Sequence, residues 1–194
     1  MEIIKLRRFN PDTDYSTMYR IYSDYNEQHS LFDIVSLNSP ERFPVTFEKA
    51  LSHNYKDFFI IEDAKTSEFV GFVISYGYSA NDGHIKVMEY IEGKFRQCGY
   101  GGIAILNFLD MLFKHYNFRK IYTEVYSFND ASINSHLVAG FEEEARLKDY
   151  RYYNNSYWDF IIYSVTKERF YEKVGATMNK LMSMVDKEET LFED

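Results

Sequence analysis

One glycine-rich stretch constrains this chain more than any other feature, because it joins a strand-like run to a strongly apolar helical run. It lies between residues 85–92 and 103–116, and its sequence is Arg96-Gln97-Cys98-Gly99-Tyr100-Gly101-Gly102. The first amides of a helix have no partner inside the helix, and the helix dipole places partial positive charge there. Glycines also let the backbone approach an anion without a Cβ in the way. The stretch therefore predicts a phosphate-binding loop that opens a helix.

A dinucleotide-binding turn is one interpretation of these glycines. Residues 99–104 match the pattern G-x-G-x-x-A, and Glu124 lies where an acidic ribose partner would belong. That pattern, however, occupies the first turn of a repeating β-α-β fold, directly after its strand. Here a meander of strand-like runs comes first, and residues 93–98 separate the last of them from the glycines. This context disfavours an NAD-dependent oxidoreductase.

Composition narrows the class of protein. The chain has 194 residues, of which 45% are hydrophobic, as is typical of one globular domain. Its net charge of −8 disfavours nucleic acid and anionic membranes as partners and is compatible with a cationic acceptor such as a polyamine. The single cysteine cannot form an internal disulfide, and the histidines have no metal-ligand spacing. Neither a signal peptide nor a membrane-spanning run is evident, so we expect a cytoplasmic protein.

Hydrophobic periodicity and turn signals predict a mixed α/β chain. Strands are expected at residues 3–9, 58–62, 68–78, 85–92, 120–126, 142–153 and 157–166. Helices are expected at 13–26, with Asp12 or Thr13 as the cap, from 46 onward, at 101–116 and at 129–139. Residues 1–168 are expected to form the main domain, and 169–194 a C-terminal amphipathic helix with an acidic tail.

Three stretches in order resemble the GNAT superfamily of N-acetyltransferases over roughly residues 3–166. Residues 91–101, with the pattern Arg96-x-x-Gly99-x-Gly101, are similar to the family's strand and pyrophosphate loop, although Gly93 stands where a proline is common. Residues 123–129, followed by Ser132 and the pair Gly140-Phe141, resemble its next strand and helix. Residues 141–163 resemble the closing hairpin of the branch that acetylates ribosomal-protein N-termini and, in relatives, spermidine or antibiotics.

The resemblance implies a fold, a cofactor and a reaction. The fold is the acyl-CoA N-acyltransferase (GNAT) fold, an α/β architecture with a mixed, twisted sheet of about seven strands flanked by helices. The cofactor is acetyl-CoA, and the reaction is direct transfer of acetyl to a primary amine. The acceptor is a peptide N-terminus, a polyamine or another small amine. A non-catalytic CoA-binding regulatory protein is the alternative, because Ile85 and Val87 stand where many relatives carry Glu or His.

The same resemblance assigns cofactor-binding positions. The backbone of the loop would hold the pyrophosphate, with Arg96 at its start, and strand residues would bond the pantetheine arm and thioester. Asn129 and Ser132 match positions that contact the cofactor's arm, although both are also good helix caps. The complete expected set is Tyr90, Ile91, Arg96, Gln97, Cys98, Gly99, Tyr100, Gly101, Gly102, Asn129 and Ser132.

Three residues are candidates for the chemistry. Transfer requires the amine to lose a proton, and it is aided when the departing thiolate gains one. Glu124 stands where some relatives carry a base, and Glu89 shares a strand face with Ile85 and Val87. His136 stands where many relatives carry a proton-donating tyrosine. Acceptor choice would lie in the first helix, its following loop and the last hairpin, and the C-terminal helix is compatible with a homodimer.

Overall fold

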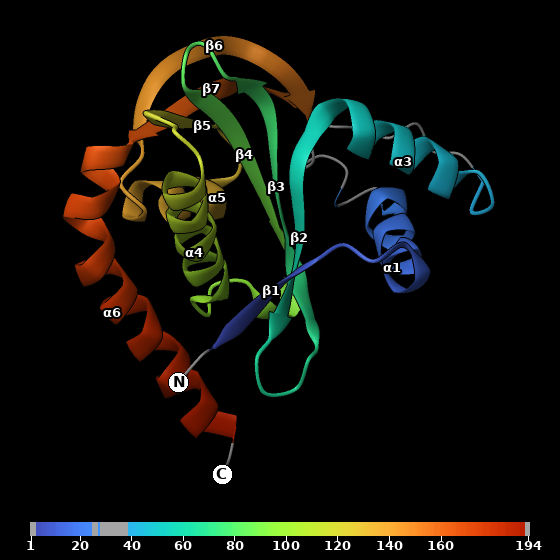
Figure 1. Cartoon of the computed structure of the whole chain (residues 1–194), viewed down its shortest axis with the longest axis horizontal. Helices are drawn as coiled ribbons and strands as arrows, with labels where there is room; N and C mark the ends of the chain where they lie inside the picture. The colour runs from blue at the N-terminus through green and yellow to red at the C-terminus, as the bar shows by residue number, and fades with distance from the viewer. Residues whose placement is uncertain (1–2, 25–26, 28–38, 193–194) are drawn as a thin grey trace.

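The computed structural model describes residues 3–24, 27 and 39–192, and its centre is one twisted sheet (Figure 1). The seven strands lie in the order β1-β2-β3-β4-β5-β7-β6. Only β4 and β5 pair in parallel among these described strands, and every other neighbouring pair is antiparallel. The strands are β1 (Ile4–Arg8), β2 (Tyr55–Asp63), β3 (Phe69–Ser79), β4 (His84–Ile91), β5 (Lys120–Tyr126), β6 (Glu142–Tyr153) and β7 (Ser156–Thr166).

Helices cover both faces of the sheet. Figure 1 shows α1 and α3 on one side and α4, α5 and α6 on the other. A short 3-10 turn, η1, lies between β4 and α4. The bounds are α1 (Pro11–Ser23), α3 (Phe43–Asn54), η1 (Gly93–Phe95), α4 (Tyr100–His115), α5 (Asp130–Val138) and α6 (Lys167–Phe192). The seven-stranded mixed sheet flanked by helices confirms the predicted fold class.

Two helix starts differ from the sequence-based expectation. The side chain of Asn10, rather than Asp12 or Thr13, caps α1, because its Oδ1 accepts the Asp12 amide at 3.1 Å. Pro11 then occupies the first turn, where its missing N–H removes no intrahelical bond. Helix α3 begins at Phe43, ahead of the expected start at residue 46. Most of the segment expected to be a loop between these helices lies outside the described residues.

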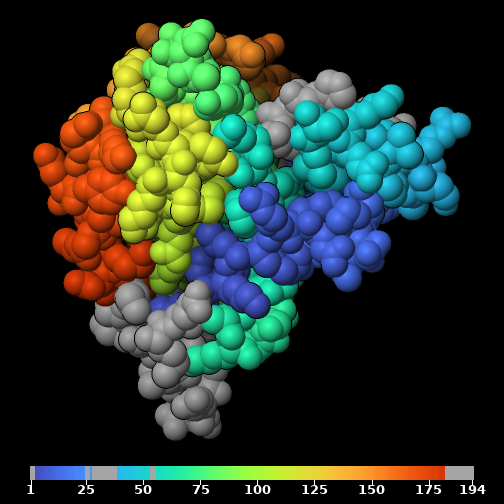
Figure 2. Space-filling model, viewed as in Figure 1, coloured from blue at the N-terminus to red at the C-terminus, as the bar shows by residue number. Residues whose placement is uncertain are grey.

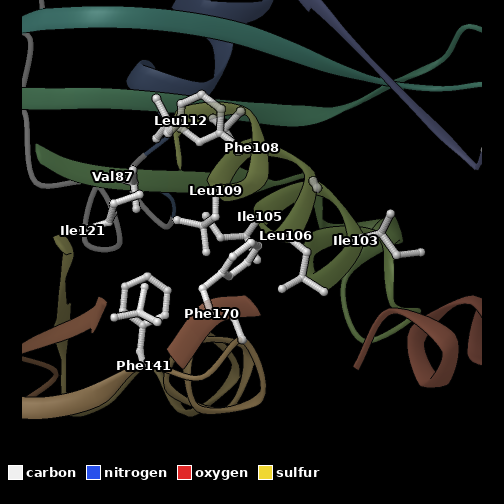
Figure 3. Packing of buried hydrophobic residues seen from close by; sticks show 14 of the residues in the cluster. Val87, Ile103, Ile105, Leu106, Phe108, Leu109, Leu112, Ile121, Phe141 and Phe170 are labelled. Carbon is white, nitrogen blue, oxygen red and sulfur yellow. The ribbon is translucent and has the colours of Figure 1, made fainter. Parts of the chain in front are cut away.

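Each face of the sheet has its own hydrophobic core. The core beneath α4 and α6 includes Val87, Ile105, Phe108, Phe141 and Phe170, which converge in Figure 3. The other core joins α1 and α3 to the opposite face and includes Met18, Ile21, Phe43, Phe47, Phe58, Phe72 and Tyr90. Because alternate residues of a strand point to opposite faces, β4 directs Val87 and Glu89 toward α4, and Met88 and Tyr90 toward α1.

The two parallel strands separate partway along their length. Pairing between β4 and β5 joins residues 84–87 to residues 120–123. Beyond this point β4 remains paired with β3 as far as Ile91, and β5 remains paired with β7 as far as Tyr126. The sheet is therefore open between residues 88–91 and 124–126, and backbone groups on the two inner edges face each other across the gap.

The C-terminal helix is longer than the sequence pattern indicated. It begins at Lys167, directly after β7, and Phe170 in its first turn is fully buried. The ring of Phe170 lies 5.4 Å from that of Phe113 on α4, measured between centroids. Within the described ranges, no helix combines the length and hydropathy needed to cross a bilayer.

Candidate active site

A pocket of about 610 Å³ opens at the point where β4 and β5 separate. Its walls include parts of five elements. The strand walls are the ends of β4 and β5, and the helical walls are the start of α4, most of α5 and one turn of α6. Its lining includes Met88, Glu89, Tyr90, Ile91, Arg96, Gln97, Gly99, Gly101, Gly102, Glu124, Asn129, Ser132, Ser135, His136, Lys180 and Leu181.

The predicted phosphate loop forms one end of this pocket. Gly99 adopts φ 91° immediately before α4, a left-handed conformation that glycine adopts without strain. The Ile103 amide donates to the Gly99 carbonyl at 3.0 Å, so the amides of Gly101 and Gly102 precede this first helical bond. A Cβ placed on Gly101 would lie 3.0 Å from Ile91 Cγ1 and would fill the cradle. The loop residues therefore fit an anionic group held by backbone amides.

Arg96 lies at the loop entrance, as expected, and its guanidinium already has protein partners. Its Nη2 is 2.6 Å from Glu27 Oε2, and its Nε donates to the Ile91 carbonyl at 2.8 Å. The guanidinium also lies 5.6 Å from the centre of the Tyr90 ring. In this arrangement Arg96 ties the loop to β4 and to Glu27, and a contact with phosphate would require it to exchange its carboxylate partner.

Two other loop residues turn away from the pocket. The Tyr100 hydroxyl donates to Asp63 Oδ2 at 2.7 Å. The part-exposed thiol of Cys98 contacts the Arg96 carbonyl at 3.1 Å. Neither residue is among the described residues that line the pocket. Any contribution of Tyr100 or Cys98 to cofactor binding would therefore come from the backbone.

Asn129 and Ser132 shape the start of α5. Asn129 Oδ1 accepts the Ser132 amide at 3.2 Å, so Asn129 is the N-cap of this helix. Ser132 Oγ lies 3.3 Å from His136 Nδ1 one turn later. Both residues line the pocket, and their contact with a cofactor's arm stays a prediction.

Glu89 places a buried carboxyl group in the pocket. Its Oε1 accepts a hydrogen bond from Ser135 Oγ on α5 at 3.3 Å, and its Oε2 is buried without a hydrogen-bond partner among the described residues. Burial raises the pKa of Glu89 to about 8, and the Ser135 hydrogen bond opposes this rise only in part. A carboxyl whose pKa lies near the working pH is suited to proton transfer.

Glu124 lies on the opposite wall and is held by two neighbours. Lys86 Nζ lies 2.5 Å from its Oε1, and the Tyr76 hydroxyl donates to its Oε2 at 3.0 Å. The carboxylate is therefore already charge-paired across the strands. To accept a proton from an amine, Glu124 would have to weaken this ion pair, which makes it a less favourable base than Glu89.

His136 is buried on α5, and this environment disfavours the proton-donor role that we expected for it. Its Nε2 lies 3.1 Å from Thr123 Oγ1, and its ring packs edge-on against Phe141. Burial lowers the pKa of His136 to about 4, and the Ser132 backbone opposes this only weakly. The imidazole is therefore neutral near pH 7, and its hydrogen bonds connect α5 to β5.

The sequence patterns did not indicate several of the pocket residues, and three of these come from two helices. Ser135 carries no motif, and its role emerges only because α5 packs over Glu89. Lys180 and Leu181 lie on α6, far from the loop in sequence, yet they line the same pocket. Helical periodicity indicates that one face of α6 is buried, but it does not indicate which surface that face covers.

A family model for the acetyltransferase (GNAT) domain matches residues 8–162, most of the chain. The chain belongs to this family. The loop, the separated strands and the α5 cap all lie within the matched range. GNAT enzymes use acetyl-CoA, so the family and the cofactor that we predicted for a member of it are confirmed.

One relative by sequence is also named an N-acetyltransferase. The SPbeta prophage-derived uncharacterized N-acetyltransferase YokL of Bacillus subtilis (strain 168) is 29% identical over 118 residues. That match covers 59% of this chain and 64% of the relative, so the chain spans less than two-thirds of that protein's length.

Solved structures share the GNAT fold. Spermidine N-acetyltransferase from Vibrio cholerae in complex with CoA and spermine aligns with a TM-score of 0.76 at 20% identity, over 87% of this chain and 98% of that one. The dodecameric structure of spermidine N-acetyltransferase from Vibrio cholerae in intermediate state has a TM-score of 0.71 at 19% identity, over 86% and 95% of the two chains. At these identities the alignments establish the fold.

Proposed function

We propose that this chain is an acetyl-CoA-dependent N-acetyltransferase that transfers acetyl directly to a primary amine, with Glu89 as the general base. The observation that carries the proposal is the position of Glu89. Its buried carboxyl lies where the two parallel strands separate, beside the glycine loop and within reach of α5.

Acetyl-CoA supplies an activated acetyl thioester when it is bound. The chain's own groups would hold the cofactor at two places. The amides around Gly101 and Gly102 suit its pyrophosphate, and the unpaired edge of β4 at Glu89–Ile91 suits the amide groups of its pantetheine arm. Asn129 and Ser132, at the start of α5, line the same pocket and would contact this arm.

Glu89 would remove a proton from the amine before or during attack. An amine that reaches the pocket arrives mostly as an ammonium ion, and only its neutral form is nucleophilic. Because the pKa of Glu89 is about 8, its ionised form is a stronger base than an exposed glutamate, whose pKa is about 4.3. Ser135 orients the carboxyl through its hydrogen bond and is a positioning residue.

Acidic side chains in the pocket favour a cationic acceptor. Glu124 and Asp130 are among its lining residues, and the whole chain carries a net charge of −8. Negative charge attracts protonated amines and disfavours anionic acceptors. The acceptor is therefore a primary amine, and the proposal includes a polyamine, a small amine and a peptide N-terminus.

A homodimer remains our expectation for the assembled state, and sedimentation velocity measures the oligomeric state.

An acceptor screen tests the proposed function. The wild-type chain and the Glu89→Gln variant are incubated with acetyl-CoA and with spermidine, a peptide with a free N-terminus or a simple diamine. Acetylated product is then measured by mass spectrometry. We expect product from at least one amine with the wild type and much less with the variant. Saturable acetyl-CoA binding without product from any amine would contradict the proposal and would favour the non-catalytic CoA-binding regulator.

A further inference from the structure

The C-terminal helix extends the wall of the pocket beyond the matched family range. Helix α6 starts at Lys167, whereas the family match ends at residue 162. Figures 1 and 2 show α6 lying along α4, and Figure 1 shows its later turns near the start of α4. Its first turn packs Phe170 against Phe113, near the end of α4. The start of α6 therefore contacts the end of α4, and the later turns of α6 lie near the start of α4. The two helices run antiparallel, so α6 brings its later residues to the glycine loop.

Leu181 makes this approach close. A Cβ placed on Gly102 would lie 2.7 Å from Leu181 Cδ1 and 2.9 Å from its Cδ2, closer than non-bonded carbons approach each other. Leu181 is 8% exposed, which is low for a residue so late in a C-terminal helix. The missing side chain at Gly102 therefore makes room for α6 as well as for an anion.

Lys180 brings a positive charge to the same end of the pocket. Among the described residues that line the pocket, Arg96 and Lys180 carry the cationic side chains. Arg96 is paired with Glu27, and Lys180 is an exposed residue of α6 that lines the same pocket. A ligand with several phosphates must find compensating charge in a chain whose net charge is −8.

We propose that α6 is part of the cofactor site, with Lys180 as a cation for the phosphate groups of acetyl-CoA and Leu181 as the apolar contact that fixes the glycine loop. This inference rests on the proposed function, because it assumes acetyl-CoA as the ligand. It assigns the C-terminal helix a binding role in addition to its packing role. It also makes cofactor affinity depend on residues outside the family's matched range.

Matched lysine variants test the charge. Lys180→Gln is compared with Lys173→Gln, an exposed lysine on the same helix that does not line the pocket. We expect Lys180→Gln to raise the Kd for acetyl-CoA about three- to tenfold at low salt and to weaken its salt dependence, because a charge-assisted contact is lost. Lys173→Gln should leave both quantities unchanged. Equal Kd values for the two variants would overturn the role of Lys180.

A double-mutant cycle tests the contact. Gly102→Ala is made in the wild type and in Leu181→Ala, and the Kd for acetyl-CoA is measured for each. We expect Gly102→Ala to cost more affinity in the wild type, where the new methyl group displaces Leu181, than in the variant that has room for it. Equal losses in the two backgrounds would overturn the role of Leu181. If the wild type binds acetyl-CoA and the Lys180 and Leu181 variants bind it with the same Kd, only this inference is refuted. If the wild type does not bind acetyl-CoA, the proposed function is refuted as well.

Discussion

The hydroxyl of Tyr100 donates a hydrogen bond to Oδ2 of Asp63 across 2.7 Å, and this bond fixes the start of α4 to the turn between β2 and β3. Asp63 Oδ1 accepts the amides of Lys65 and Thr66 at 2.9 and 2.8 Å. Burial alone would raise the pKa of Asp63, but the hydrogen bonds from Thr66, Tyr100 and Lys65 together hold its pKa below the usual value. The glycine loop is therefore anchored from outside the pocket by Tyr100, which occupies the unspecified position between Gly99 and Gly101 in the pattern.

Loss of this anchor should destabilise the fold. We expect Tyr100→Phe to lower the free energy of unfolding by about 1–3 kcal/mol, because it leaves a buried carboxylate oxygen without a donor. Urea unfolding monitored by circular dichroism measures the change. Tyr157→Phe is the matched control, since Tyr157 is 65% exposed on β7. Equal stability of the two variants would contradict the anchoring role.

Filling the glycine cradle should weaken cofactor binding without unfolding the chain. Gly101→Ala introduces a methyl group 3.0 Å from Ile91 Cγ1, where backbone amides are expected to meet phosphate. We expect the Kd for acetyl-CoA to rise about tenfold or more, the equivalent of about 1.4 kcal/mol. Titration calorimetry measures it.

Gly175→Ala is the control for this substitution. Gly175 lies inside α6, and a Cβ built there meets no atom within 4 Å. It should stabilise the protein by about 0.5–1 kcal/mol through helix propensity and leave the Kd unchanged. An unchanged Kd in Gly101→Ala would mean that the ligand does not approach this backbone.

The pH dependence of the reaction should report Glu89. Its base form grows as pH rises through about 8, so kcat/KM for an amine acceptor should rise over the same interval. Glu89→Gln should lower kcat/KM by about a hundredfold or more and remove the inflection near pH 8, leaving only the steady rise that deprotonation of the amine itself causes. Fixed-time assays of CoA release at pH values from 6 to 10 measure both the size of kcat/KM and its pH dependence.

Two further variants make the assignment of Glu89 specific. Glu124→Gln removes the second candidate carboxylate, which is paired with Lys86, and should retain the inflection near pH 8. Glu168→Gln changes an exposed glutamate in the first turn of α6 and should behave as the wild type. An inflection near pH 8 that persists in Glu89→Gln and disappears in Glu124→Gln would transfer the base role to Glu124.

His136 should make the fold sensitive to acid. Its pKa is about 4 in the folded protein and about 6.5 in the unfolded chain, so the unfolded state binds the extra proton first. Stability is therefore lost as pH falls from 6.5 to 4, by up to about 3 kcal/mol. Glu89 acts in the opposite direction between its unfolded and folded pKa values, because its folded form retains its proton up to about pH 8.

The difference between wild type and His136→Gln isolates the histidine. Glutamine keeps the ability to hydrogen bond with Thr123 and Ser132 but does not titrate. The difference in unfolding free energy should change with pH between 6.5 and 4 and be flat above pH 7.5. A flat difference throughout would show that His136 can be protonated in the folded state at its ordinary pKa.

The sequence predicted those features that local chemistry decides. Alternation predicted β4 and placed Glu89 on the face of Val87, and the structure directs that face toward α4. The strands predicted at 142–153 and 157–166 leave only a short connection, in which Asn154 and Asn155 adopt φ of 50° and 59°, a left-handed conformation that asparagine tolerates. These features depend on a few neighbouring residues, so a single sequence contains the information.

Features that depend on distant packing could not be predicted. Nothing near Arg96 in the sequence indicates that Glu27 neutralises it, and nothing near Gly102 indicates Leu181. The low pKa of His136 likewise arises from burial among α5, β5 and Phe141, which its own sequence neighbours do not determine. The residue type suggested that His136 donates a proton, whereas burial keeps its imidazole ring neutral near pH 7.

The most direct test of the central claim is a ligand titration of thermal stability with acetyl-CoA, CoA and NAD, each added alone. A ligand that binds only the native state raises the midpoint of unfolding as its concentration exceeds its dissociation constant. The glycine loop and the separated strands predict a clear, concentration-dependent rise with acetyl-CoA and CoA and none with NAD. A rise with NAD alone, or no rise with either CoA species, would contradict the assignment of this pocket to acetyl-CoA.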